Sequence, residues 1–208
     1  MSIAVAVTRF DNKTEEENMI WRKKNNYNGC IYGVSQKISS NIKEGIYIII
    51  FEMNITTNNI IGIGLIKNEV MKRKKIYSNG NYNRFVYKGS IRLDKQQLVN
   101  NSELNISQLE LPLFYGNAHF KRGTGITIIN KSMIKHIESL KLTNNSNFND
   151  LMVEITKIKF LNSKEFNRDE INLNEKLNSK SINQILYTKD VIKPVLSSHT
   201  APPFLYSL

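Results

Sequence analysis

The segment Tyr82–Leu93 (YNRFVYKGSIRL) mixes aromatic and basic residues in a nearly regular alternation. If the segment forms a strand, successive side chains point to opposite faces. One face then resembles core and carries Phe85, Tyr87, Gly89, Ile91 and Leu93. The other face is either an ordinary solvated face or a row of cations that follows phosphates, and it carries Arg84, Val86, Lys88, Ser90 and Arg92.

Two kinds of side chain in this chain suit a nucleic acid, because aromatic rings stack on bases and cations neutralise the backbone. The candidates to stack on or enclose a base are Trp21, Tyr32 and Tyr82, with Ser35 and Asn83 to hydrogen-bond its edge. For Trp21 and Tyr32 a place in the hydrophobic core is the alternative. The candidates for phosphate contacts are Lys72, Arg73, Lys74, Lys75, Arg84, Lys88, Arg92, Lys121 and Arg122.

The charge of the chain agrees with a polyanionic partner. Its 208 residues carry a net charge of +11. Residues 1–135 hold 20 Lys and Arg against 10 Asp and Glu, whereas residues 136–208 hold 9 against 8. A basic region of this kind is expected to bind nucleic acid at least nonspecifically. A soluble protein that is merely basic is the alternative.

The rarer residues argue against several other classes of protein. The single cysteine, Cys30, permits no internal disulfide, and with only three histidines it argues against a zinc site. We expect no cofactor and no transmembrane segment, because no apolar run reaches the roughly 18 residues of a spanning helix. The N-terminus lacks the pattern of a secretory signal. We therefore expect the protein inside a cell, in cytoplasm or nucleus, or in a virus particle.

A glycine-rich loop near residue 120 raises two further possibilities. The sequence HFKRGTGIT lacks the Gly-Lys-Ser/Thr that a P-loop requires, so a nucleotide loop of that kind is excluded. Its backbone amides could still approach a phosphate beside Lys121 and Arg122, with a plain basic turn as the alternative. His119 is a candidate general acid or base, but no nucleophile or paired carboxylate accompanies it in a motif.

The elements that must position these residues are mostly strands. Dense β-branched and aromatic residues predict strands at residues 3–10, 30–35, 46–53 and 60–67. Helix starts are predicted from the capping residues Thr14, Asp94 with Gln97, and Asn130 or Ser132. Gly62 and Gly64 share one face of their strand, which favours close approach of another backbone or strong curvature.

The order of these elements resembles the PUA-like group of small β-barrels, especially EVE and YTH domains. The resemblance covers residues 3–140 and rests on a Trp-bearing segment before GCIYGVSQKIS, a Lys-x-Gly lead into an apolar strand, and the return strand IIGIGLIKN. It implies an aromatic-walled pocket that grips a base, often a modified one. The segments GIGLIKN, NGNYNRFVYKGSIRLD and FYGNAHFKRGTGIT also resemble uncharacterised proteins of large eukaryotic DNA viruses.

We therefore expect an α+β protein with a small, partly closed PUA-like β-barrel and peripheral helices at residues 1–140. A polar helical appendage and a Pro-containing tail would follow at residues 141–208. The leading hypothesis is a non-catalytic protein that binds DNA or RNA. The competing hypothesis is a virion structural or assembly protein that bridges genome, capsid or membrane, with residues 191–208 docking onto a partner or a second copy. The third is a nucleic-acid-processing enzyme that uses His119.

Overall fold

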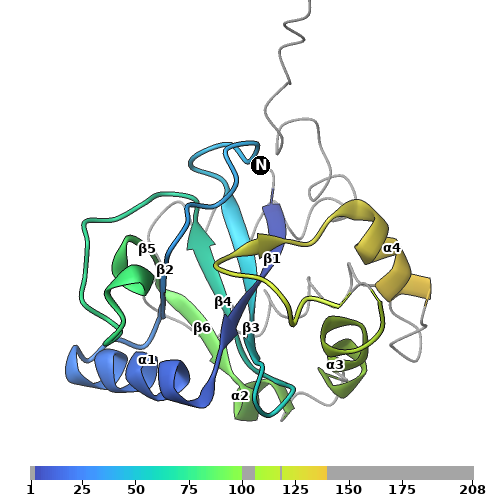
Figure 1. The fold of residues 1–208 in the computed structure, drawn as a ribbon, viewed down its shortest axis with the longest axis horizontal. Coiled ribbons are helices and arrows are strands. Elements are labelled where there is room, and N and C mark those ends of the chain that lie inside the picture. The colour runs from blue at the N-terminus through green and yellow to red at the C-terminus, as the bar shows by residue number, and fades with distance from the viewer. Residues whose placement is uncertain (1–2, 100–105, 118, 140–208) are drawn as a thin grey trace, which may run out of the picture.

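The computed structural model describes residues 3–99, 106–117 and 119–139 and has an α+β fold (Figure 1). The predicted appendage and tail at residues 141–208 lie outside the described residues. A five-stranded sheet has the strand order β6-β4-β3-β1-β7, and β2 and β5 form a separate two-stranded sheet. The strands of the described part of the chain do not close into a barrel.

The main sheet is mixed. Its strands are β1 (Ile3–Phe10), β3 (Tyr47–Asn54), β4 (Asn59–Lys67), β6 (Ile91–Asp94) and β7 (Thr127–Ile128). β1 runs parallel to β3, and the other neighbouring strands are antiparallel. A parallel pair needs a crossover, which here contains helix α1 (Asn12–Lys24) and β2 (Cys30–Val34). The four strands predicted from composition are confirmed to within one residue at each end.

Both faces of the main sheet are covered, so alternate residues of its central strands enter two different cores. On β3, Ile49 and Phe51 enter a core shared with α2 (Lys95–Val99), α3 (Ile106–Phe114) and α4 (Lys131–Ser139). Ile48 and Ile50 enter the opposite core, shared with β2 and β5 (Phe85–Gly89). Figure 1 shows these two layers on opposite sides of the sheet. Burial on both faces explains why β3 is an uninterrupted apolar run.

The β2–β5 sheet approaches β4 closely at glycines. A Cβ at Gly64 would overlap the hydroxyl of Tyr32 on β2, and a Cβ at Gly89 would overlap the carbonyl oxygen of Leu65 on β4. Gly62 is crowded in the same way by neighbouring side chains. The close approach predicted from Gly62 and Gly64 is therefore confirmed, and it brings the ring of Tyr32 against the main sheet.

Side chains cap the starts of three helices. Asp11 caps α1 by accepting a hydrogen bond from the Thr14 amide at 2.7 Å, so the prediction of Thr14 as the cap is wrong by three residues. Asp94 and Gln97 form the predicted capping box of α2. Asn130 caps α4 as one of the two predicted candidates. None of the described helices is long and apolar enough to cross a membrane.

The segment Tyr82–Leu93 is not one strand. It begins in a 3-10 turn, η1 (Gly80–Asn83), and it changes sheet at Ser90, because β5 pairs with β2 whereas β6 pairs with β4. The predicted division into a core face and a cationic face is wrong, since the adjacent residues Val86 and Tyr87 are both buried. Val86 and Tyr87 both belong to the core between the main sheet and the β2–β5 sheet, so β5 lacks the period of two that a half-exposed strand shows.

Candidate nucleic-acid interface

A cavity of about 120 Å³ lies at the carboxyl end of β1, where segments far apart in the sequence converge. The walls come from the end of β1, the start of α1, the end of β2, the β3–β4 turn, η1 with the residues before it, and the loop Gly123–Gly125. We call this cavity the β1 pocket. Of the predicted site residues, the structure places Tyr82 in its wall.

One wall of the β1 pocket is a pair of tyrosine rings. Tyr82 is 40% exposed, whereas Tyr77 is 3% exposed. The two rings meet edge to face, with centroids 6.2 Å apart and planes at 88°. Asn18 on α1 donates a hydrogen bond to the Tyr77 hydroxyl at 3.0 Å, and burial raises the pKa of that hydroxyl. The buried ring thus holds the exposed ring in place, which leaves the Tyr82 ring accessible for stacking.

Another part of the pocket wall contains a half-buried guanidinium. Arg9 donates through Nε to the Phe120 carbonyl, and through Nη1 to the Gly125 carbonyl at 3.3 Å and the Thr127 hydroxyl at 3.0 Å. Arg9 forms no ion pair with any described residue. Burial lowers its pKa to about 10. The side chain therefore fixes the glycine-rich loop to β1 while its positive charge is matched only by neutral acceptors.

The loop that Arg9 holds depends on glycine. Gly123 and Gly125 have φ of 149° and 67°, which L side chains rarely adopt. A Cβ at Gly123 would also approach the guanidinium carbon of Arg9 to 3.0 Å. The sequence left open whether the backbone of this loop approaches a phosphate or forms a plain basic turn, and the structure places Gly123–Gly125 in the wall of the β1 pocket.

The pocket also contains a carboxylate. Asp11 and Thr14 form a reciprocal capping box, in which Asp11 donates its amide to the Thr14 hydroxyl at 2.9 Å. Hydrogen bonds from Thr14 lower the pKa of Asp11, so the carboxylate is ionised at neutral pH. The β1 pocket thus offers guanidinium donors, carboxylate acceptors and an exposed ring, which is a set that can hydrogen-bond and stack on a heteroaromatic base.

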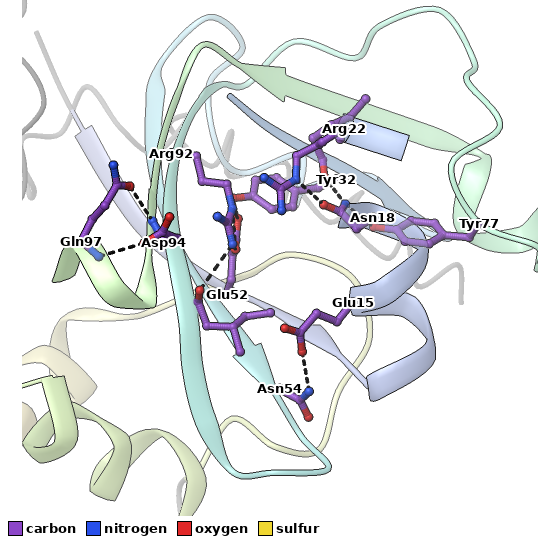
Figure 2. A network of polar contacts seen from close by, with 12 residues as sticks. Glu15, Asn18, Arg22, Tyr32, Glu52, Asn54, Tyr77, Arg92, Asp94 and Gln97 are labelled. Atoms are coloured by element: carbon purple, nitrogen blue, oxygen red, sulfur yellow. Dashed lines mark hydrogen bonds and ion pairs between the residues drawn. The ribbon is translucent and has the colours of Figure 1, made fainter. Parts of the chain in front are cut away.

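A second polar cluster lies in the interior between β2, β3 and β6 (Figure 2). Glu52 on β3 is 3% exposed. It accepts a hydrogen bond from the Tyr32 hydroxyl at 2.8 Å and from Arg92 Nη2 at 2.6 Å, with Arg92 Nε at 3.0 Å. Burial opposes the charge on Arg92, but the Glu52 carboxylate outweighs it and raises the pKa of Arg92. We call these three residues the Glu52 network.

Three of the predicted site residues are therefore engaged internally. Tyr32 is 1% exposed, and burial raises the pKa of its hydroxyl well above the usual value. Asn83 is 3% exposed and accepts hydrogen bonds from the Ile76 and Tyr77 amides. Arg92 is ion-paired with Glu52. In this structure Tyr32 and Asn83 cannot reach a base, and Arg92 does not lie in an open row of cations with Arg84 and Lys88.

The remaining candidates are spread over the surface. Trp21 is half-buried and packs edge to face on Tyr27 with ring centroids 6.3 Å apart, and it does not line the β1 pocket. Lys88 places its Nζ 3.9 Å from the centroid of the Tyr27 ring. Ser35 is half-buried directly after Val34, which lines the pocket.

The loop cations are the most accessible of the predicted phosphate contacts. Lys121 is half-buried, and those that are exposed are Lys72, Arg73, Lys74, Lys75, Arg84 and Arg122. Within the part of the chain that the structure describes, none of these side chains forms an ion pair. Lys72–Lys75 precede Ile76 and Tyr77 in the chain, and Arg84 follows η1, so two of the loops that carry cations also supply the tyrosine wall.

Three residues of the pocket wall that matter most for binding were not predicted as site residues from the sequence: Arg9, Asp11 and Tyr77. Arg9 carried a usable signal, because a cation inside a strand with two buried faces needs a polar partner. Tyr77 carried no such signal in the sequence, because a tyrosine that follows a run of lysines fits a surface loop as well as a pocket wall.

His119 and Cys30 are the two described side chains to consider as acid, base or nucleophile. His119 Nδ1 accepts a hydrogen bond from the Lys121 amide at 3.1 Å, and no described carboxylate is hydrogen-bonded to it. Cys30 is buried, and burial raises the pKa of its thiol to about 12. A thiol in that state is a poor nucleophile. No cluster of three potential metal ligands occurs among the described residues.

Comparison with protein-family models, with curated proteins and with solved structures finds no match to this chain. The class that the structure itself defines is an α+β protein with a sheet covered on both faces and a polar pocket at the carboxyl end of β1.

Proposed function

We propose that this protein is a non-catalytic nucleic-acid-binding protein that holds one base in the β1 pocket. The main support for this proposal is the composition of the pocket, which combines the exposed ring of Tyr82 with the hydrogen-bond donors of Arg9 and the acceptors of Asp11. Stacking supplies affinity for any base, and a fixed donor beside a fixed acceptor supplies selectivity for one base edge.

The charges outside the pocket support a strand that continues beyond the held base. The Lys72–Lys75 loop and Arg84 are exposed and flank the segment that carries Tyr77 and Tyr82. Cations beside a stacking platform follow the phosphates on either side of the base. The affinity is therefore expected to fall steeply as salt concentration rises.

The finer form of the proposal is a PUA-like reader. A base pocket between two packed β layers is what the resemblance to EVE and YTH domains implies. In this proposal the main sheet and the β2–β5 sheet serve as the two sides of a partly closed barrel, and the β1 pocket lies at its mouth. The base that fits, modified or not, is then the one that pairs with Arg9 and Asp11.

The test is binding of short single-stranded RNA and DNA, measured by fluorescence anisotropy, with Tyr82→Ala as the variant. Loss of a stacked base costs about 1–3 kcal/mol, so the dissociation constant should rise by about 5-fold to 150-fold. Tyr115→Ala is the matched control, because Tyr115 is also exposed, at 54%, and does not line the pocket.

The result that would overturn the proposal is equal binding by the wild type, Tyr82→Ala and Tyr115→Ala, or no binding of either polymer at low salt. Nucleoside analysis of nucleic acid that copurifies with the wild type and not with Tyr82→Ala would identify the base.

A further inference from the structure

A second depression, of about 590 Å³, lies between the end of α1 and β6 with α2. Its lining has an excess of cations, with Arg22, Lys23 and Arg92 against the single carboxylate of Asp94. The rest of the lining is Met19, Tyr27 and the side-chain amides of Asn26, Asn28 and Gln97. We call this depression the α1–β6 groove.

Arg22 is the guanidinium of this groove that forms no ion pair with a described residue. It donates through Nε to the Asn18 side-chain oxygen at 3.1 Å (Figure 2). It forms no ion pair and no second hydrogen bond with any described residue, so both terminal nitrogens of its guanidinium have donors to spare. Burial lowers the pKa of Arg22, and the nearby Arg92 lowers it further, while the Glu52 carboxylate acts in the opposite direction.

The other guanidinium is already neutralised. Arg92 pairs with Glu52, and the acidic rim residue Asp94 is occupied as the cap of α2 through the Gln97 amide. The Gln97 side-chain oxygen accepts from the Asp94 amide, which leaves its NH₂ group as a donor. The groove therefore presents two cations that form no ion pair with a described residue, Arg22 and Lys23, beside the Asp94 carboxylate and the side-chain amides of Asn26, Asn28 and Gln97.

The simplest alternative is that Arg22 only complements the negative end of the α1 dipole. Lys23 and Lys24 meet that need, because they are exposed in the same last turn. Arg22 instead turns back one helical turn toward Asn18, away from the free carbonyls of the C-terminus. Its position is thus fixed by Asn18 and not by the helix end.

We infer that the α1–β6 groove is an anion site that takes a phosphate group, with Arg22 as the main contact and the amides of Asn26, Asn28 and Gln97 as additional donors. A guanidinium with two free nitrogens matches two phosphate oxygens, and neutral amides can donate to the rest without adding repulsion. The site is separate from the β1 pocket and does not rest on base binding there.

The phosphate could belong to a free small molecule or to a nucleic-acid strand. Isothermal titration with inorganic phosphate, with a nucleoside 5′-monophosphate and with a single-stranded octanucleotide separates these sources. Arg22→Gln is the variant, and Lys24→Gln is the matched control, because it removes the same charge from the same helix turn outside the groove. Arg22→Lys keeps the charge and loses the forked geometry.

The wild type and Lys24→Gln should bind at least one of these probes with equal affinity. Arg22→Gln should raise the dissociation constant about tenfold, and Arg22→Lys should lie between them. An effect on all three probes indicates a site for an isolated phosphate, and an effect on the octanucleotide alone indicates a backbone contact.

The inference is overturned if Arg22→Gln and Lys24→Gln behave alike with every probe, or if no probe binds at all. Circular dichroism of each variant checks that the fold is intact. Tyr82→Ala tests the β1 pocket independently, since it should leave binding of inorganic phosphate unchanged whatever it does to oligonucleotides.

Discussion

Arg9 and Arg92 are both half-buried arginines on strands of the same sheet, yet their surroundings differ in one decisive respect. Arg92 faces the carboxylate of Glu52, which raises its pKa. Arg9 faces two backbone carbonyls and a hydroxyl, and burial lowers its pKa to about 10. The charge of Arg92 is therefore neutralised by an ion pair inside the fold. The charge of Arg9 has no ion-pair partner among the described residues.

The comparison separates a structural region from the proposed binding region. In the Glu52 network the Tyr32 hydroxyl and the Arg92 guanidinium both donate to the buried Glu52 carboxylate. The charges of this pair are therefore balanced without an external ligand. In the β1 pocket a charge without a described ion-pair partner lies beside a cavity and an exposed ring. Uncompensated charge costs stability, and a ligand that supplies the missing acceptor recovers that cost as binding energy. The predictions below test this division and run from the largest expected loss of stability to the smallest.

Glu52→Gln should have the largest effect, because it leaves Arg92 as a buried charge without its partner. Breaking one side of a buried ion pair costs about 3–5 kcal/mol, and urea unfolding measures it. Glu69→Gln is the control, since the Glu69–Lys67 pair is exposed and its loss should cost under about 1 kcal/mol. Equal losses in the two variants would mean that the Glu52 network is not structural.

Gly64→Ala should destabilise the protein by about 1–3 kcal/mol, the usual cost of overpacking. The added methyl group would overlap the Tyr32 hydroxyl and push the β2–β5 sheet from β4. Thermal unfolding measures the change. Gly80→Ala is the comparison variant, because a Cβ there meets nothing within 4 Å. A neutral Gly64→Ala would argue against the close approach of the two sheets.

Tyr77→Phe should cost about 0.5–1.5 kcal/mol, the usual net value of one hydrogen bond. It removes the acceptor of the Asn18 amide, which still donates to the Ile31 carbonyl at 2.7 Å. The phenyl ring should keep its edge-to-face contact with Tyr82, so oligonucleotide affinity should change less than in Tyr82→Ala. A larger loss of affinity than of stability would show that the Tyr77 hydroxyl itself contacts the ligand.

The double variant Lys74→Gln, Lys75→Gln should leave unfolding within about 0.5 kcal/mol of the wild type, as exposed substitutions do. Its oligonucleotide affinity should fall, and the slope of log affinity against log salt should flatten by about one per lysine that contacts a phosphate. Titrations at several salt concentrations measure both quantities. An unchanged slope would remove these lysines from the interface.

Much of the fold was predictable because local signals and tertiary demands agreed. The β-branched run of β3 and the glycines of β4 specify a strand buried on both sides and a close neighbour, whatever the rest of the chain does. The capping box of Asp94 and Gln97 is equally local. Segment Tyr82–Leu93 failed as a prediction because its alternation fitted one long strand, whereas the chain divides it between two sheets at Ser90.

The candidate site was less predictable for a related reason. The residue type shows that a ring can stack on a base or that a cation can contact a phosphate. Whether the side chain is exposed enough to make that contact depends on its burial in the fold. Tyr82 and Tyr32 are both tyrosines next to small or polar residues. Tyr82 is exposed at the pocket, whereas Tyr32 is buried and donates a hydrogen bond to Glu52. Trp21 packs on Tyr27 instead of entering the pocket.

By itself the sequence determined the strand-rich α+β class, the basic character of the first two thirds of the chain and the glycines that permit tight packing, because these follow from composition and local periodicity. Only the tertiary structure decided which cations are neutralised. Ion pairs join residues such as Glu52 and Arg92 that lie on different strands, 40 positions apart. No local pattern encodes that pairing, and it is the pairing that leaves Arg9 and Arg22 with unmatched charge.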